Sequence, residues 1–224
     1  MVRFVVMAAG QAARMGMDKL ALPWGQSTVL GHVLTCCLQA LEHWDMVPES
    51  DVLRRAGIKP EIRVVARKPI SRYLSEPVIA EFTQQGGTWL EVENPQPLAD
   101  TIRAGILAMP QNFQGVCFIP GDQVGLVPEI LADMTKCFLD SPADFLIPVA
   151  GNQPGSPVFF HRKYLAELAA LQGENGGKKV ALGHPEVWKT YEVEKSFLAD
   201  VDTLDEYNLL LAKRALKPKK GMGA

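Results

Sequence analysis

The sequence lacks any long hydrophobic run and any excess of charge of one sign. Its apolar start is interrupted at Gly10 and Arg14, and no stretch approaches the roughly 20 apolar residues that span a bilayer. The formal net charge of −2 gives no bulk electrostatic reason to bind nucleic acid or an anionic membrane. We therefore expect a cytoplasmic protein with neither partner.

Cysteine and histidine are also scarce, and neither is spaced as a set of metal ligands. The cysteines form no C-x-x-C pair, and the histidines are scattered along the chain. We predict reduced, buried thiols rather than disulfides or a zinc site, and histidines that serve at the surface or in packing. The residues concerned are Cys36, Cys37, Cys117, Cys137, His32, His43, His161 and His184.

The rest of the composition is that of an ordinary soluble protein, with 47% hydrophobic and 21% charged residues in 224. Apolar strand-like runs alternate with segments of helical periodicity, which predicts parallel strands joined by right-handed crossovers. We therefore expect a three-layer α/β/α sandwich around a mostly parallel, Rossmann-like sheet. It would form a single domain over 1–216, followed by a flexible basic tail at 217–224. The expected strands are 4–7, 61–66, 88–92, 115–119, 144–149 and 158–160, and the main expected helices are 29–41 and 98–109.

The first strand is followed by a loop of alanine and glycine that carries two cations, Arg14 and Lys19. Small residues let backbone amides approach an anion closely, and consecutive amides can form a concave anion-binding nest. Arg14 can donate a fork of hydrogen bonds to phosphate oxygens, and Lys19 supplies a point charge. The pattern indicates a loop that holds a polyphosphate.

Two widespread phosphate-binding motifs do not fit this loop. The dinucleotide fingerprint needs three glycines, whereas the loop has Gly10 and Gly16 with five residues between them. The Walker A motif needs lysine directly after its second glycine, and Met17 stands there. An ordinary strand-to-helix turn with two solvated cations also accounts for the spacing, so the loop alone does not decide the function.

Two aspartates are candidates for a metal at the same end of the sheet. Asp122 follows the strand predicted at 115–119, and a carboxylate there could hold Mg²⁺ against nucleotide phosphates. Asp122 could equally be a turn residue that accepts local amide hydrogen bonds. Asp202 precedes the last predicted helix and is either a second metal ligand or, like Thr203, a helix cap.

The loop motif resembles the signature of nucleotidyltransferases that attach a nucleotide to molybdopterin. Ala-Ala-Gly at 8–10, Arg-Met-Gly at 14–16, Lys19 and Leu-Pro-Trp-Gly at 22–25 carry the resemblance. Within that group the chain is most similar to molybdenum cofactor cytidylyltransferases and the related molybdenum hydroxylase accessory proteins. The resemblance implies a fold like that of nucleotide-diphospho-sugar transferases. It also implies nucleotide binding by Ala8, Ala9, Gly10, Arg14, Gly16 and Lys19.

The chain departs from the family pattern at several positions. Val124 stands where the family's Gly-Asp-x-Pro motif has proline, and Lys178 stands for an arginine. Asp100 puts a negative charge near the expected triphosphate. Ala9 replaces a second glycine that is typical of the guanylyltransferase branch, and this favours CTP over GTP.

The resemblance implies an enzyme that transfers CMP from CTP to the phosphate of molybdopterin and releases pyrophosphate. Its cofactor would be Mg²⁺, held by Asp122 and Asp202, with Arg14, Lys19 and Asp122 as the catalytic residues. Two other functions stay open. One is a non-catalytic accessory protein that binds the molybdenum cofactor and delivers it to a molybdenum hydroxylase, and the other is a nucleotidyltransferase that acts on a sugar or polyol phosphate.

Overall fold

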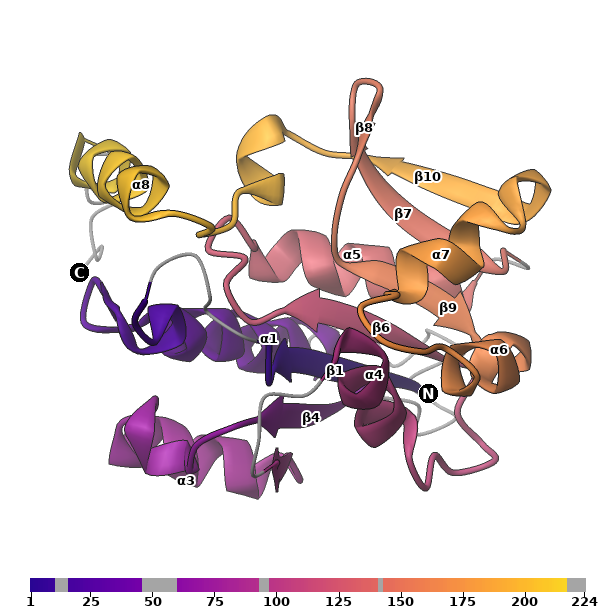
Figure 1. Ribbon diagram of the computed structural model, residues 1–224, viewed down its shortest axis with the longest axis horizontal. Coiled ribbons are helices and arrows are strands. Elements are labelled where there is room, and N and C mark those ends of the chain that lie inside the picture. The colour runs from indigo at the N-terminus through magenta and orange to yellow at the C-terminus, as the bar shows by residue number, and fades with distance from the viewer. Residues whose placement is uncertain (11–15, 46–59, 93–96, 141–142, 217–224) are drawn as a thin grey trace.

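A mixed, mostly parallel β-sheet forms the middle layer of the computed structural model, which describes residues 1–10, 16–45, 60–92, 97–140 and 143–216 (Figure 1). The strand order is β10-β7-β9-β6-β1-β4-β5, and β8 pairs with β7. Of the strands along this order, β9 runs antiparallel to its neighbours. The strands are β1 (Val2–Ala8), β4 (Glu61–Ala66), β5 (Thr88–Glu91), β6 (Gly115–Pro120), β7 (Phe145–Ala150), β8 (Gln153–Pro154), β9 (Val158–His161) and β10 (Trp188–Glu192).

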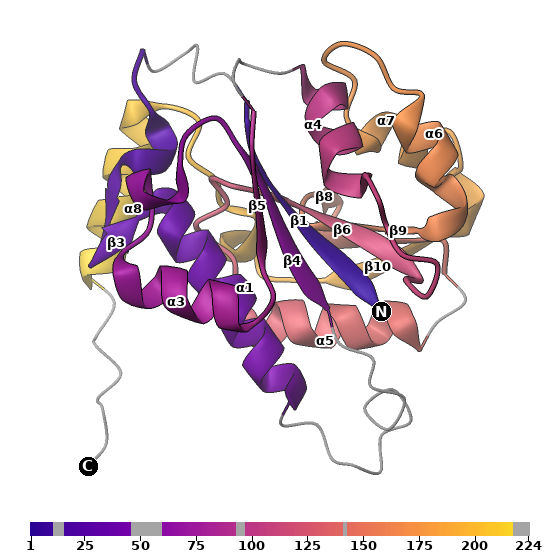
Figure 2. The same ribbon diagram turned by 90° about the horizontal axis from the view of Figure 1, so that it is seen from below.

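Helices cover both faces of this sheet, so the predicted three-layer sandwich is confirmed (Figure 2). One face carries α1 (Val29–Asp45), α3 (Glu76–Gln84) and α5 (Pro128–Leu139), and the other carries α4 (Leu98–Ile106), α6 (Leu165–Ala169) and α7 (Gly177–Leu182). The last helix, α8 (Leu204–Leu216), packs near the ribbon of β2 (Pro23–Trp24) and β3 (Ser27–Thr28). The short 3₁₀ helices are η1 (Lys19–Ala21), η2 (Ile70–Arg72), η3 (Arg162–Tyr164), η4 (Pro185–Val187) and η5 (Lys195–Leu198).

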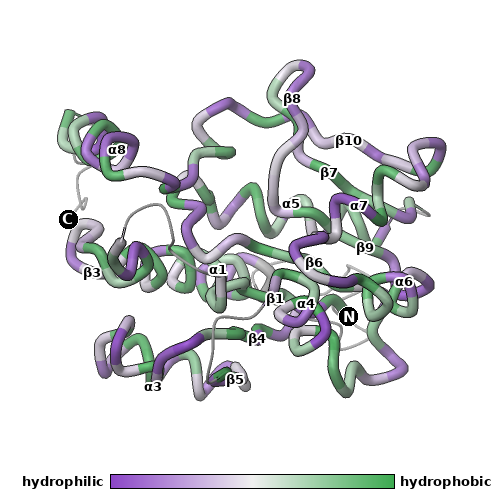
Figure 3. The backbone as a smooth tube through the Cα atoms, viewed as in Figure 1, coloured by the Kyte–Doolittle hydropathy of each residue, from purple (hydrophilic) through white to green (hydrophobic). Residues whose placement is uncertain are grey.

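The sheet separates two hydrophobic cores because neighbouring side chains of a strand point to opposite faces. In β1, Phe4 and Val6 belong to the core under α1 and α5, whereas Val5 belongs to the core under α4 and α6. The inner strands are buried on both faces and read as continuous apolar runs. Figure 3 shows this along β7, while the turn at β8 is hydrophilic.

Helix α1 begins where the sequence predicts. The backbone N–H of Gly31 donates to Thr28 Oγ1 at 2.9 Å, and Thr28 Oγ1 in turn donates to the carbonyl of Tyr73 at 2.7 Å. This satisfies one of the free N–H groups of the first turn, as an N-cap does. The cap also joins α1 to the chain leaving η2.

The predicted helix at 98–109 ends earlier, at Ile106. Leu107 leaves the helical conformation, and Ala108 has a φ of 51°. The carbonyl of Leu107 accepts a hydrogen bond at 3.0 Å from Arg3, a residue that is 2% exposed. A buried guanidinium needs acceptors, so this tertiary contact ends the helix before its sequence pattern does.

Three of the four cysteines are buried, as predicted. Cys36, Cys37 and Cys117 are buried free thiols, whereas Cys137 is a half-buried one. Burial raises the pKa of Cys36 to about 12, which keeps it a neutral thiol at physiological pH.

No helix among the described residues is long and apolar enough to cross a bilayer.

Close packing around Gly125 generates a stability prediction. A Cβ added to Gly125 would lie 2.1 Å from the carbonyl oxygen of Ser196 and 2.8 Å from that of Phe197. Backbone atoms cannot rotate away as a flexible side chain can, so Gly125→Ala should destabilise the fold by about 1 to 3 kcal/mol. Urea unfolding without nucleotide checks this. Gly10→Ala is the matched control because an added Cβ there meets no atom of the described residues within 4 Å. Equal stability of the two variants would contradict the packing.

Candidate active site

The connection between strands creates a crevice at the carboxyl ends of β1 and β6. The chain runs from β1 outward to β4 and β5, and then returns to place β6 on the other side of β1. Ligands of such sheets bind at the point where the strand order reverses. The Gly121 N–H donates to the carbonyl of Met7 at 3.0 Å, so the loop after β6 lies against the end of β1. This places Asp122 beside the predicted phosphate loop.

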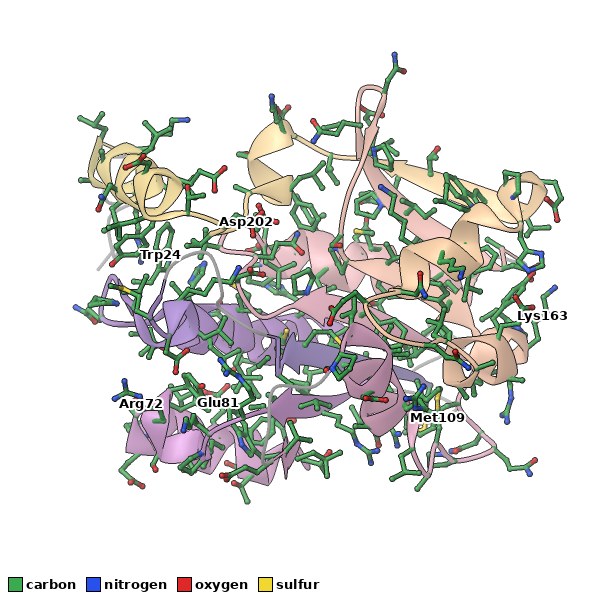
Figure 4. The ribbon with its side chains drawn as sticks, viewed as in Figure 1. Trp24, Arg72, Glu81, Met109, Lys163 and Asp202 are labelled. Atoms are coloured by element: carbon green, nitrogen blue, oxygen red, sulfur yellow. The ribbon has the colours of Figure 1, made fainter. Side chains whose placement is uncertain are left out.

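Lys19 joins the two loops through its ammonium group. Lys19 Nζ forms an ion pair with Asp122 and lies 3.3 Å from Asp202 Oδ1. It also donates to the carbonyl of Val201 at 2.8 Å. Three segments far apart in the sequence therefore meet at one cation. Figure 4 shows Asp202 in the segment that leads into α8.

The electrostatics of this cluster favour a cation. Burial alone would lower the pKa of Lys19, but Asp122 and Asp202 outweigh it and raise the pKa above its usual 10.5. Burial, followed by repulsion from Asp122 and Asp202, raises the pKa of Asp200 to about 6. Burial and the two neighbouring carboxylates together make Asp200 harder to ionise. Added positive charge would relieve the repulsion.

The side chain of Asp202 is not the helix cap. The N–H of Glu206 donates to Thr203 Oγ1 at 3.2 Å, and the N–H of Thr203 donates to Glu206 Oε2 at 3.0 Å. Thr203 and Glu206 therefore form a reciprocal capping box at the start of α8. The carboxylate of Asp202 instead faces Lys19, so Thr203 is the cap, and a metal-binding role for Asp202 stays a prediction.

The last strand of the sheet was not among the strands expected from the sequence. It is β10, which ends at Glu192, and η5 stands between it and α8. The polar strand β10, Trp-Lys-Thr-Tyr-Glu, had no apolar pattern that could have revealed it. It lies at the sheet edge, where one neighbour suffices.

The structure describes the two ends of the predicted phosphate loop, up to Gly10 and from Gly16 onward. Ala8 and Ala9 are buried, while Gly10 is exposed and lines a cavity. Gly16 has a φ of 63°, a conformation that favours glycine. Arg14 lies outside the described residues. The structure thus brings Lys19, Asp122 and Asp202 together, and the roles of the loop residues stay predictions.

A cavity of about 480 Å³ opens beside this cluster, between α4 and α7. Its walls are mainly apolar and include Gly10 from the loop, Pro120 from the end of β6 and Phe160 from β9. Side-chain polar groups come from Thr101, Ser156 and Lys178. Gly155, Ser156 and Val158 also line it. Phe159 and Phe160 are both buried.

Gln123 has a role that the sequence did not reveal. It is 1% exposed, and its Nε2 donates to the carbonyls of Ser156 at 2.7 Å and Phe197 at 3.0 Å. It thus ties the loop after β6 to the cavity wall and to η5. From the sequence, a polar residue next to Asp122 would be expected to contact a ligand. No local pattern in the sequence indicates that Gln123 is buried.

The charge of Asp100 is neutralised locally. Asp100 forms an ion pair with Arg103 one turn later in α4. The departure from the family pattern therefore adds a paired carboxylate rather than an isolated one, which weakens the objection that it would repel a triphosphate.

The fold and this cluster define a nucleotidyltransferase. The family model of the MobA-like NTP transferase domain matches residues 4–187, and the chain belongs to this family. The predicted family is thereby confirmed. No curated protein matches the chain significantly.

Solved structures with the same fold include nucleotidyltransferases of several kinds. Rv0371c from Mycobacterium tuberculosis is 25% identical, with a TM-score of 0.71, over 94% of this chain and 97% of that one. Its manganese complex is 23% identical, with a TM-score of 0.67, over 94% and 98%. CMP:2-keto-3-deoxy-manno-octonic acid synthetase, complexed with CTP, is 14% identical, with a TM-score of 0.65, over 96% and 98%. Molybdopterin-guanine dinucleotide biosynthesis protein A from Archaeoglobus fulgidus is 14% identical, with a TM-score of 0.59, over 96% and 100%.

The cation at the centre of the cluster should contribute to stability. Lys19→Met leaves Asp122 and Asp202 facing each other without compensation, and we expect a loss of about 1 to 3 kcal/mol in unfolding free energy at pH 7. The folded pKa of Lys19 is raised, so its contribution is complete below about 10.5 and is lost as the pH rises through the folded value. The effect should therefore be equal at pH 7 and pH 9 in urea unfolding. Lys189→Met, at an exposed position of β10, is the control, and an equal effect of both variants would refute the role of the cluster.

Proposed function

We propose that the protein transfers CMP from CTP to the terminal phosphate of molybdopterin and releases pyrophosphate, with Mg²⁺ as cofactor. The observation that carries the proposal is the convergence of Lys19, Asp122 and Asp202 at the carboxyl rim of the sheet, beside the Ala-Ala-Gly loop. Membership in an NTP transferase family supports nucleotide chemistry at this rim. Ala9, in place of a second glycine, supports CTP.

The carboxylates of Asp122 and Asp202 suit a magnesium ion. Both oxygen-bearing groups already surround one cation, Lys19 Nζ, and Mg²⁺ takes one or two carboxylates together with water and phosphate oxygens. Among the described residues, no group of three or more Asp, Glu, His or Cys side chains is arranged to hold a metal alone, so phosphate oxygens would complete the coordination. When bound, the metal would neutralise phosphate charge. The manganese complex of Rv0371c supports a divalent ion.

The chain needs no nucleophilic side chain for this reaction. An oxygen of the acceptor phosphate forms a bond to the α-phosphorus of CTP as the bond to the pyrophosphate oxygen breaks. Such reactions depend on positioning and charge neutralisation. Lys19 would supply positive charge at the α-phosphate, and Arg14 is proposed to bind the β- and γ-phosphates.

The cavity beside the cluster supports a ring-containing acceptor. Apolar walls can contact the faces of a planar heterocycle such as a pterin, and Lys178 offers a charge for an acceptor phosphate. A sugar or polyol phosphate would leave many hydroxyls against these apolar walls without partners. The likeness in fold to a CTP-bound synthetase nonetheless keeps this second acceptor class as an alternative.

We also propose that residues 1–216 act as one catalytic domain. The family match ends at residue 187, yet Val201 and Asp202 contact Lys19 from the other end of the chain. The segment before α8 would thus complete the site.

The alternative function is a non-catalytic accessory protein that serves a molybdenum hydroxylase. It is supported by Val124, which replaces the family's proline.

Asp122→Ala should abolish metal-dependent release of pyrophosphate from CTP in the presence of molybdopterin, because it removes a carboxylate that would hold the metal. A coupled pyrophosphate assay measures this. Asp205→Ala removes an acid of the first turn of α8 and should leave turnover nearly unchanged. Full activity of Asp122→Ala would exclude Asp122 as a metal ligand.

A panel of nucleotides and acceptors tests the substrates. With molybdopterin, CTP should give faster pyrophosphate release than GTP, and the product should be a cytosine dinucleotide by mass spectrometry. Turnover with a sugar or polyol phosphate but not with molybdopterin would establish the alternative acceptor. Binding of molybdopterin without turnover of any nucleotide would favour the accessory role.

A further inference from the structure

A second cavity, of about 690 Å³, lies on the face of the sheet opposite the proposed acceptor cavity. Its apolar walls belong to the core under α1 and α5, whereas those of the first cavity belong to the core under α4 and α7. It is formed by η5, the C-terminal half of α8, Trp24 of β2 and the loop after Asp122. Trp24 and the segment before α8 lie at the same end of the molecule (Figure 4).

Every charged side chain in the lining of this cavity is positive. Lys195 comes from η5, and Lys213 and Arg214 come from α8. In the part of the chain that the structure describes, none of the three forms an ion pair. Glu194 and Asp200 flank η5 in the sequence, but neither lines the cavity. The chain as a whole has a net charge of −2, so this is a local concentration of unpaired positive charge.

The cations surround an apolar floor. Trp24 is 5% exposed, and Leu126 is 3% exposed. The guanidinium of Arg214 lies 5.3 Å from the centroid of the Trp24 ring, which holds the charge at the edge of the cavity by a cation–π contact. An occupant would therefore meet both an apolar surface and preorganised positive charge.

This combination selects the class of occupant. A small inorganic anion would not use the apolar floor, and a flat bilayer cannot enter a concave site. An acidic protein segment with a large apolar side chain fits both features, because the apolar group can fill the floor while carboxylates pair with the rim. The sequence extends the positive charge, with Lys217, Lys219 and Lys220 and no acid after Glu206.

We propose that this cavity is the docking site for an acidic segment of a partner protein, anchored by an aromatic or large aliphatic side chain. The proposal does not depend on the nucleotide or acceptor used at the other cavity. The docking site lies close to the proposed active site, since the N–H of Val124 in its wall donates to the carbonyl of Asp122 at 2.9 Å.

Selection from a displayed library of random peptides on the full chain tests the proposal. We expect enriched peptides to combine aspartate or glutamate with phenylalanine, tryptophan or leucine. In calorimetry with the synthesised peptides, the double substitution Lys213→Gln and Arg214→Gln should weaken binding about tenfold. Lys195→Gln, in a different element, should weaken it in the same direction. Circular dichroism should show that these exposed substitutions leave the fold intact.

A charge-matched control is the double substitution Arg72→Gln and Lys189→Gln, two exposed cations outside the cavity, which should leave the affinity unchanged. Enriched peptides without acidic residues, or equal binding by all variants, would overturn the proposal. Inorganic pyrophosphate and vesicles containing phosphatidylserine are tested alongside. Binding of either one that is lost with Lys213 and Arg214, without enrichment of acidic peptides, would also overturn it and assign the cavity to a small anion or a membrane.

Discussion

The contact of Lys19 with Asp122 and Asp202 is the interaction on which the arrangement of the site depends. It joins the loop after β1, the loop after β6 and the segment before α8. Two carboxylates at one rim repel each other, so a cation must lie between them for the three segments to close together. Burial, followed by repulsion from Asp122 and Asp202, raises the pKa of the nearby Asp200. The same charge pattern suits a metal and a nucleotide polyphosphate.

Hydrogen bonds and close packing hold in place the segments that carry this ionic cluster. Gln123 holds the loop after β6 against the proposed acceptor cavity and against η5. Because Gly125 has no side chain, the backbone of η5 can lie close to it. The N–H of Gly125 can therefore donate to the carbonyl of Ala199. The capping box of Thr203 and Glu206 then fixes the start of α8, which leaves Asp202 directed at Lys19. The positions of the acids therefore follow from these hydrogen bonds and from close packing at Gly125.

The two cavities lie on opposite faces of the sheet and differ in the charge of their linings. The smaller one is apolar with a single cation, Lys178, and lies beside Gly10. The larger one is rimmed by three cations around Trp24. The smaller cavity is lined by Pro120 at the end of β6, and the larger one by Val124 to Val127 of the loop that follows, so one short segment connects the proposed active site to the proposed docking site.

The sequence alone determined the class of fold, the strands of the inner sheet and the candidate residues Lys19, Asp122 and Asp202, because local hydrophobic periodicity and a contiguous motif carry that information. It could not show the edge strand β10, the early end of α4 at Ile106, or the burial of Gln123, because each depends on partners distant in the chain. Whether Asp202 capped a helix or faced Lys19 was likewise decided by tertiary structure. A carboxylate can do either locally, and only the packing of the segment before α8 against Lys19 brought the two together.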